Sequence, residues 1–248
     1  MIFEKNADER REVASITKLM TALLVLEALD RDEIALTDSV QISPRAAAMK
    51  GSQALLDASA VYPLEDLLRT TIMASANDSA VALSEYIAGS EENFVDRMNR
   101  RAAELGMTNT NYVNCTGYPQ SGQYTTARDV CRLCCEIAKH PRYNQYASVW
   151  IDKLTHPGGR VTDLTNTNRL VRFYEGCDGY KTGSTDAAKY CLAATAEKNG
   201  MRLVAIVLGT PVSQTRFNEA RQMLDYGFAT YRLSLIHISE PTRPEPIS

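Results

Sequence analysis

The chain has 248 residues, of which 44% are apolar and 23% charged, and its formal net charge is −3. This composition is typical of a globular protein long enough to bury a full core. It shows neither the basic excess of a nucleic-acid-binding protein nor the low hydrophobicity of a disordered chain, so no nucleic-acid partner is expected. No apolar run reaches the roughly 18 residues of a membrane-spanning helix.

The first elements expected are a short strand at Met1–Lys5 and a helix that begins near Ser15. Apolar residues recur with a helical period from Ile16 to Leu29, over a surface wide enough to make this helix central. The segment follows acidic residues, and no small-residue cleavage site comes after it, so it is interpreted as mature protein rather than as a signal peptide.

Ser15 and Lys18 lie at the start of this helix, three positions apart and therefore on one face. A buried lysine with a lowered pKa can take the proton of a serine hydroxyl, which makes the serine a nucleophile. A Ser-x-x-Lys pair also occurs by chance in a chain of this length.

The middle of the chain is predicted to be mainly helical. A brief strand at 40–42 precedes helices expected at 63–74, 79–88, 91–105 and from Thr126 to just before Pro141. Ser75 and Asn77 fall between two of these helices, where they could relay a proton and bind a peptide, or simply cap a helix.

Six cysteines are present. Cys131, Cys134 and Cys135 fall within a helical pattern, and no second Cys-x-x-Cys or His pair completes a ligand set. Buried thiols are therefore expected, with no metal and no cofactor.

Strands are predicted after residue 149. Two short strands flank Pro157-Gly158-Gly159, a third begins at Gly179, and Asn199-Gly200 joins two apolar runs as a hairpin. A final helix is expected from Ser213 to about Tyr231. Lys181-Thr182-Gly183 lies on the third strand, where it could hold a carboxylate; alternatively, Lys181 is a solvated edge-strand lysine.

These elements predict an α/β fold with an antiparallel sheet flanked by helices and an inserted helical subdomain. One domain is expected over 1–232, with an α/β part at 1–44 and 150–232 and a mainly helical part at 45–149. Residues 233–248 are rich in proline and break the pattern, so they are expected to be a non-native tail.

The ordered set Ser-x-x-Lys, Ser-x-Asn and Lys-Thr-Gly resembles the penicillin-recognising serine enzymes. Over residues 2–232 the chain is similar to serine-type D-Ala-D-Ala carboxypeptidases, the low-molecular-mass penicillin-binding proteins, which implies a β-lactamase/transpeptidase-like fold. Further matching stretches are Glu4–Asp8, Ala14–Leu23, Ser75–Asp78, Leu105–Thr110, Asn166–Asn168, Asp178–Gly183 and Leu224–Phe228.

The resemblance implies that Ser15 is the acylated nucleophile and Lys18 its general base. It also implies that Ser75 passes a proton to the leaving D-alanine, while Asn77 holds the amide of the substrate. Lys181 would supply positive potential.

Substrate binding is implied for the residues that follow Lys181. Thr182 would bind the terminal carboxylate, Gly183 would let the substrate approach closely, and the N–H groups of Ser15 and Ser184 would form the oxyanion hole. Arg216 is a further candidate for the carboxylate, with a surface helix arginine as the alternative.

The implied partners are peptidoglycan stem peptides ending in D-Ala-D-Ala and β-lactam antibiotics. The implied location is extracytoplasmic, in the periplasm or on the outer face of the cytoplasmic membrane. A signal peptide, a first strand and a C-terminal region with the membrane anchor are expected only in the full-length protein, so the chain is interpreted as a fragment.

The chain departs from the family pattern at Asn114-Cys115-Thr116-Gly117, where the family usually has Asn-Pro, and at Gln123, where it often has His. Two alternatives remain. A serine β-lactamase shares the three motifs, but it commonly needs a Glu-x-x-Leu-Asn loop, which does not occur here. A non-catalytic fragment would keep only the binding of peptidoglycan or penicillin.

Overall fold

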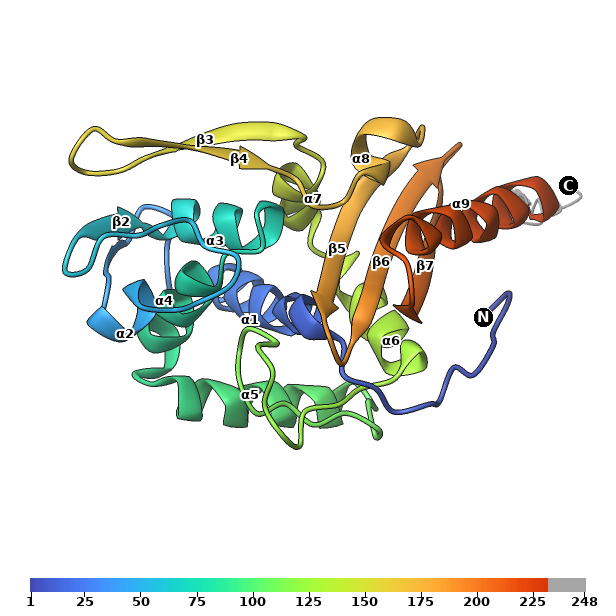
Figure 1. Ribbon diagram of the computed structural model, residues 1–248, viewed down its shortest axis with the longest axis horizontal. Helices are drawn as coiled ribbons and strands as arrows, with labels where there is room; N and C mark the ends of the chain where they lie inside the picture. Colours follow the sequence, from blue (N-terminus) through green and yellow to red (C-terminus); the bar gives the residue numbers. More distant parts are fainter. Residues whose placement is uncertain (232–248) are drawn as a thin grey trace, which may run out of the picture.

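The computed structural model describes residues 1–231, so the tail expected at 233–248 lies outside the described residues. Helix α1 (Lys18–Asp30) runs through the middle of the molecule, and ten of its 13 residues are buried, as its apolar sequence predicts (Figure 1). A 3-10 turn, η1 (Ala14–Thr17), leads into it and carries Ser15. The nucleophile candidate therefore stands on a turn anchored by the most buried helix.

A three-stranded antiparallel sheet lies beside η1, in the order β5 (Cys177–Thr185), β6 (Lys189–Lys198), β7 (Met201–Thr210). The expected Asn199-Gly200 turn joins β6 to β7, with positive φ angles of 52° and 75° at its two residues. The long helix α9 (Ser213–Thr230) covers one face of the sheet, and the other face packs on the helical core (Figure 1).

The remaining helices surround α1. They are α2 (Pro44–Ala47), α3 (Leu64–Met73), α4 (Asn77–Ala88), α5 (Glu91–Glu104), α6 (Ala127–Ile137), α7 (Pro141–Ala147) and α8 (Leu170–Phe173). The predicted bounds of α3, α4 and α5 lie within two residues of those observed, and α6 ends three residues before the predicted end; α2, α7 and α8 were not predicted. Gly89 ends α4 in the left-handed region, and Thr126 caps α6 through its side chain. No helix among residues 1–231 is long and apolar enough to cross a membrane.

Two small hairpin-like pairs lie outside the central sheet. Strand β1 (Ser39–Gln41) pairs with β2 (Val61–Pro63), and β3 (Ile151–Thr155) pairs with β4 (Val161–Thr165). Strand β2 was not predicted, because Pro63 is a typical first residue of a helix. In the structure Pro63 is the last residue of β2, and α3 begins at Leu64.

Three expectations are wrong. Met1–Lys5 is exposed and forms no strand; Glu4 and Asp8 instead form ion pairs with Arg128 of α6. Strands from the two ends of the chain do not share one sheet, since β1 pairs only with β2. Cys135 is exposed and Cys131 half-buried, because both lie on the outer face of α6 while Cys134 faces the core.

The N-cap of α6 offers a test of this account of the fold. The Thr126 hydroxyl accepts a hydrogen bond from the Asp129 N–H at 3.1 Å. Replacing Thr126 by Ala should lower the free energy of unfolding by about 1 kcal/mol, because one buried N–H loses its acceptor. Urea denaturation measures the change. Thr230→Ala, at the exposed end of α9, is the control and should change the value by less than about 0.5 kcal/mol; equal losses in the two variants would contradict the capping role.

Candidate active site

The amine of Lys18 lies at the centre of the candidate site. Its Nζ is 2.9 Å from Ser15 Oγ, 2.6 Å from Asn77 Oδ1 and 2.8 Å from the carbonyl oxygen of Thr116. The side chain is only 1% exposed. Burial lowers the pKa of Lys18 to about 7, although Cys115 and Asp78 act in the opposite direction.

The three contacts determine where the lone pair of a neutral Lys18 points. A neutral amine has two N–H groups and one lone pair. The Asn77 and Thr116 oxygens can only accept hydrogen bonds, so they take both N–H groups and leave the lone pair for the Ser15 hydroxyl proton. The amide orientation of Asn77 is supported independently, because its Nδ2 donates to the Lys50 carbonyl at 2.5 Å. The geometry is that of a general base next to its nucleophile.

The Ser75–Asn77 segment connects α3 to α4. Ser75 is buried, and its φ of 64° lies in the left-handed region of the backbone map. Helix α4 begins at Asn77, two residues before the expected Ser79, and no side chain caps its N-terminus. The helix-capping alternative is therefore wrong for Asn77, whose side chain contacts Lys18 instead.

Asp78 holds the neighbouring loop against this segment. Its carboxylate is fully buried and accepts hydrogen bonds from the Ala54 and Leu56 N–H groups at 3.0 and 3.1 Å. The loop passes so close to Asn77 that a Cβ added at Gly51 would lie 2.8 Å from its Nδ2. The loop therefore fixes the Asn77 amide from the side opposite Lys18.

Strand β5 brings the third motif against η1. A Cβ added at Gly183 would lie 2.3 Å from the Val13 carbonyl oxygen and 3.1 Å from the Ser15 nitrogen, so only glycine allows this approach. Ser184, the next residue, is exposed. The strand and the turn that carries the nucleophile thus form adjoining walls of one site.

Lys181 is buried, so the solvated-lysine alternative is wrong. Its pKa is held well below the usual range by burial and by the positive charges of Lys18 and Arg216. Within residues 1–231, its Nζ makes one long hydrogen bond, 3.2 Å to the Thr182 carbonyl oxygen. The Thr182 hydroxyl donates to Thr167 Oγ1 at 2.7 Å.

Arg216 reaches the sheet from α9 and is also buried, so the surface-arginine alternative is wrong. Its Nη1 donates to the carbonyls of Gly183 and Cys191 at 3.0 and 3.1 Å, while its Nε is buried and has no partner among the described residues. Arg216 therefore contacts the backbone of the motif strand, and its binding of a substrate carboxylate stays a prediction.

Sequence reasoning missed the contact that the Thr116 carbonyl makes with Lys18. Asn114 Oδ1 accepts from the N–H groups of Thr116 and Gly117 at 3.2 and 2.7 Å, which folds the loop. Gly117 has a φ of 78°, and a Cβ there would lie 1.9 Å from the Ala14 carbonyl oxygen. The Asn-x-x-Gly spacing is the only signal, since a backbone carbonyl acceptor leaves no trace in the sequence.

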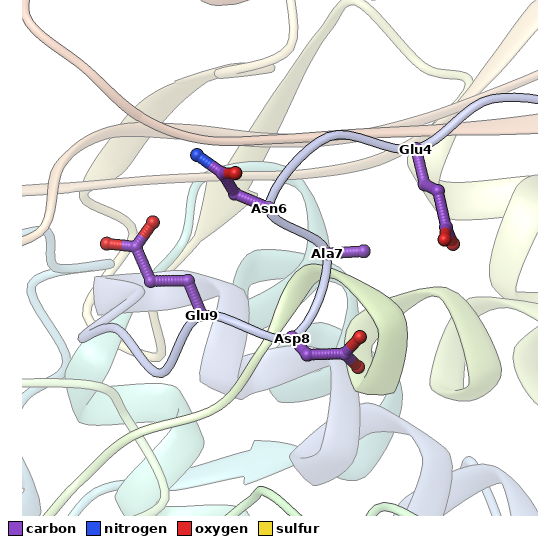
Figure 2. A pocket seen from close by; sticks show the side chains of 5 residues that line it. All are labelled: Glu4, Asn6, Ala7, Asp8 and Glu9. Carbon is purple, nitrogen blue, oxygen red and sulfur yellow. The ribbon is translucent and has the colours of Figure 1, made fainter.

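Other clusters do not involve the candidate site residues. A hollow of about 520 Å³ is lined by Glu4, Asn6, Ala7, Asp8 and Glu9 of the N-terminal segment (Figure 2). Within residues 1–231, one group of three possible metal ligands occurs, Glu27, Glu136 and His140, and Arg101 already binds both carboxylates, at 2.8 and 3.0 Å.

Comparison with known proteins identifies relatives of the chain. The D-alanyl-D-alanine carboxypeptidase family, Peptidase S11, matches residues 1–212. The carboxypeptidase DacF of Bacillus subtilis is 41% identical over 231 residues, which are 93% of this chain and 59% of that protein. The chain thus spans about three fifths of the length of that curated relative.

Solved structures share the fold. Penicillin-binding protein D2 of Listeria monocytogenes, in its ampicillin-bound form, has a TM-score of 0.80 and 32% identity, with 91% of each chain covered. The Streptomyces K15 DD-transpeptidase has a TM-score of 0.84 and 28% identity, with 92% of each chain covered. The expected α/β transpeptidase-like fold is confirmed, and the extent of these matches means that the chain belongs to the D-alanyl-D-alanine carboxypeptidase family.

Proposed function

We propose that this chain is the catalytic part of a serine D-Ala-D-Ala carboxypeptidase, which removes the terminal D-alanine from peptidoglycan stem peptides and is inhibited by β-lactams. One observation carries the proposal: the buried Lys18 amine contacts Ser15 Oγ while two carbonyl-type oxygens occupy its other positions. Because peptidoglycan lies outside the cytoplasm, the proposed location is extracytoplasmic.

In the proposed acylation step, Ser15 Oγ attacks the carbonyl carbon between the two D-alanines as Lys18 takes its proton. The N–H groups of Ser15 and Ser184 stabilise the oxyanion, and their proposed pairing is supported by the contact between Gly183 and η1. Ser75 passes a proton to the leaving D-alanine nitrogen as its C–N bond breaks. Water then hydrolyses the acyl-enzyme, with Lys18 again as the base.

Asn77 keeps the capacity to bind the peptide. Its Oδ1 has a second lone pair beyond the one used by Lys18, and its Nδ2 has a second N–H beyond the one donated to Lys50. One donor and one acceptor of a substrate amide can therefore be satisfied at the same side chain.

The substrate carboxylate is proposed to bind near Lys181 and Thr182. Lys181 is buried near the positive groups of Lys18 and Arg216, and among the described residues its Nζ makes a single long hydrogen bond, so an anion would relieve its unfavourable environment. The Arg216 guanidinium, whose Nε has no partner among the described residues, adds positive potential at Lys181. The Thr182 hydroxyl would rotate from Thr167 to donate to the carboxylate.

Release of D-alanine from a peptide ending in D-Ala-D-Ala tests the proposal directly. Ser15→Ala removes the hydroxyl that Lys18 contacts and should lower kcat by at least about 10⁴-fold. The circular dichroism spectrum of this variant should match that of the unchanged chain, because a single oxygen is lost at a turn. Release by the Ser15→Ala variant at the original rate would rule out Ser15 as the nucleophile.

The pH dependence follows from the lowered pKa of Lys18. Below about pH 7 the amine is protonated in the folded protein and has no lone pair for the Ser15 proton, so kcat/KM should fall about tenfold per pH unit. The carboxylate of the peptide stays ionised from pH 5 to pH 8, so it does not contribute to the pH dependence of kcat/KM. Steady-state rates across this range provide the measurement, and a flat profile between pH 5 and pH 7 would contradict the role of Lys18.

The loop that carries Thr116 should affect the reaction rate through its backbone, because the Thr116 carbonyl accepts a hydrogen bond from Lys18. In Gly117→Ala the new Cβ must push the loop away from Ala14, which displaces the Thr116 carbonyl from Lys18. We expect kcat/KM to fall by about 100-fold, the usual effect of a misplacement of about 1 Å.

Gly122→Ala is the matched control. Gly122 also has a left-handed φ, 91°, but a Cβ there meets only Val113 Cγ1 at 3.7 Å. Both variants carry the same kind of backbone strain, so a difference in kcat/KM reports the clash at Ala14. Equal activities would show that the Thr116 carbonyl does not position Lys18.

A further inference from the structure

The outer face of α6 carries a pair of accessible thiols. Besides Asp129, the buried residues of this helix are Val130, Leu133, Cys134 and Ile137, which places Cys131 and Cys135 on the outer side, one turn apart. Cys135 is exposed, Cys131 is half-buried, and both are free thiols. The proposed reaction uses neither of them.

Both thiols line a surface hollow of about 510 Å³. The charged side chains that also line it are three cations and one carboxylate, Arg128, Arg132, Lys139 and Glu136, and the N-terminal residue Met1 lines it as well. Reactive cysteines are found in such partly exposed sites with an excess of positive charge. The hollow therefore gives Cys135 access to a small molecule and surroundings that favour its anion.

The two thiols are chemically unequal. Interaction with the neighbouring Cys131 thiol, with a further contribution from Lys139, lowers the pKa of Cys135 to about 6. The same interaction raises the pKa of Cys131. At neutral pH Cys135 is thus largely the thiolate, and Cys131 stays a thiol.

We propose that Cys135 is a site of reversible thiol–disulfide exchange with low-molecular-weight disulfides, with Cys131 as the donor that stabilises its thiolate. The Cys135 thiolate attacks one sulfur of the disulfide, forms a mixed disulfide, and releases the other half as a thiolate, which takes a proton from water. No further oxidant is required. This inference does not depend on the proposed carboxypeptidase activity.

The exchange should stop at the mixed disulfide. Residues four apart in a helix have Cβ atoms about 5–6 Å apart, whereas a disulfide needs about 3.5–4.5 Å. Closing a Cys131–Cys135 bond would thus require α6 to distort, and α6 is held by its buried face and by its contacts with α1 and β7.

Oxidised glutathione is the probe for the full chain under native conditions. We expect the intact mass to increase by one glutathionyl group, peptide mapping to place it on Cys135, and dithiothreitol to remove it. Cys135→Ser should take up none, while Cys191→Ser, which removes a buried thiol, should be modified like the unchanged chain. Modification of another cysteine, or an internal disulfide, would overturn the proposal.

Cys131→Ser separates specific activation from simple exposure. Without the thiol donor the pKa of Cys135 should return toward that of a free cysteine, about 8.5, which lowers its thiolate fraction at pH 6.5 by nearly 80-fold. The more basic thiolate is also more nucleophilic, so the net rate should fall about fivefold. Circular dichroism verifies the fold of each variant. An unchanged rate and pH profile in Cys131→Ser would show that Cys131 does not activate Cys135.

Discussion

The environment of one buried amine organises this structure. Lys18 lies at the start of the most buried helix, is 1% exposed, and its Nζ contacts oxygens of Ser15, Asn77 and Thr116. A buried ammonium group is costly, which favours the neutral form near pH 7. A neutral amine must still satisfy its hydrogen-bonding groups, and this requirement sets the positions of the three neighbours.

Four segments far apart in the sequence meet around that amine. Turn η1 supplies Ser15, the start of α4 supplies Asn77, the 114–117 loop supplies a carbonyl, and β5 forms the adjoining wall. Glycines at 117 and 183 allow the closest of these approaches, since a side chain at either would collide with the backbone near Ser15. Because α1 is buried and carries Lys18, its packing fixes the position of the amine around which these segments meet, before any substrate binds.

Much of the fold could be predicted because local rules agreed with the tertiary structure. Apolar periodicity predicted α1, Gly89 and Thr126 marked helix ends, and Asn199-Gly200 marked the hairpin of the central sheet. The Ser-x-x-Lys and Ser-x-Asn motifs contain Ser15, Lys18 and Asn77, whose side chains are in contact, because their chemistry requires specific residue types. These features depend on residues close together in the sequence or on side-chain identity.

The rest depended on tertiary contacts that have no local signature. The Thr116 carbonyl is a backbone group that any residue provides, and its role appears only when the loop lies against Lys18. Met1–Lys5 has a strand-like composition, but no strand pairs with it in the described part of the chain. Glu4 and the nearby Asp8 form ion pairs with Arg128 instead. The exposure of Cys135 depends on which face of α6 packs inward, and the cysteines occur on both faces.

In the proposed mechanism Ser15 is an activated nucleophile, and acylation needs only Ser15, Lys18 and an oxyanion hole. Deacylation needs a positioned water, and the tethered leaving group of a β-lactam blocks its approach. The sequence contains no Glu-x-x-Leu-Asn loop that would supply a separate base for this step. Mass spectrometry after incubation with penicillin therefore tests the central claim most directly. We expect one long-lived adduct on the peptide that contains Ser15, and none in the Ser15→Ala variant. An unlabelled folded chain, or rapid multiple turnover of penicillin, would contradict the proposed mechanism.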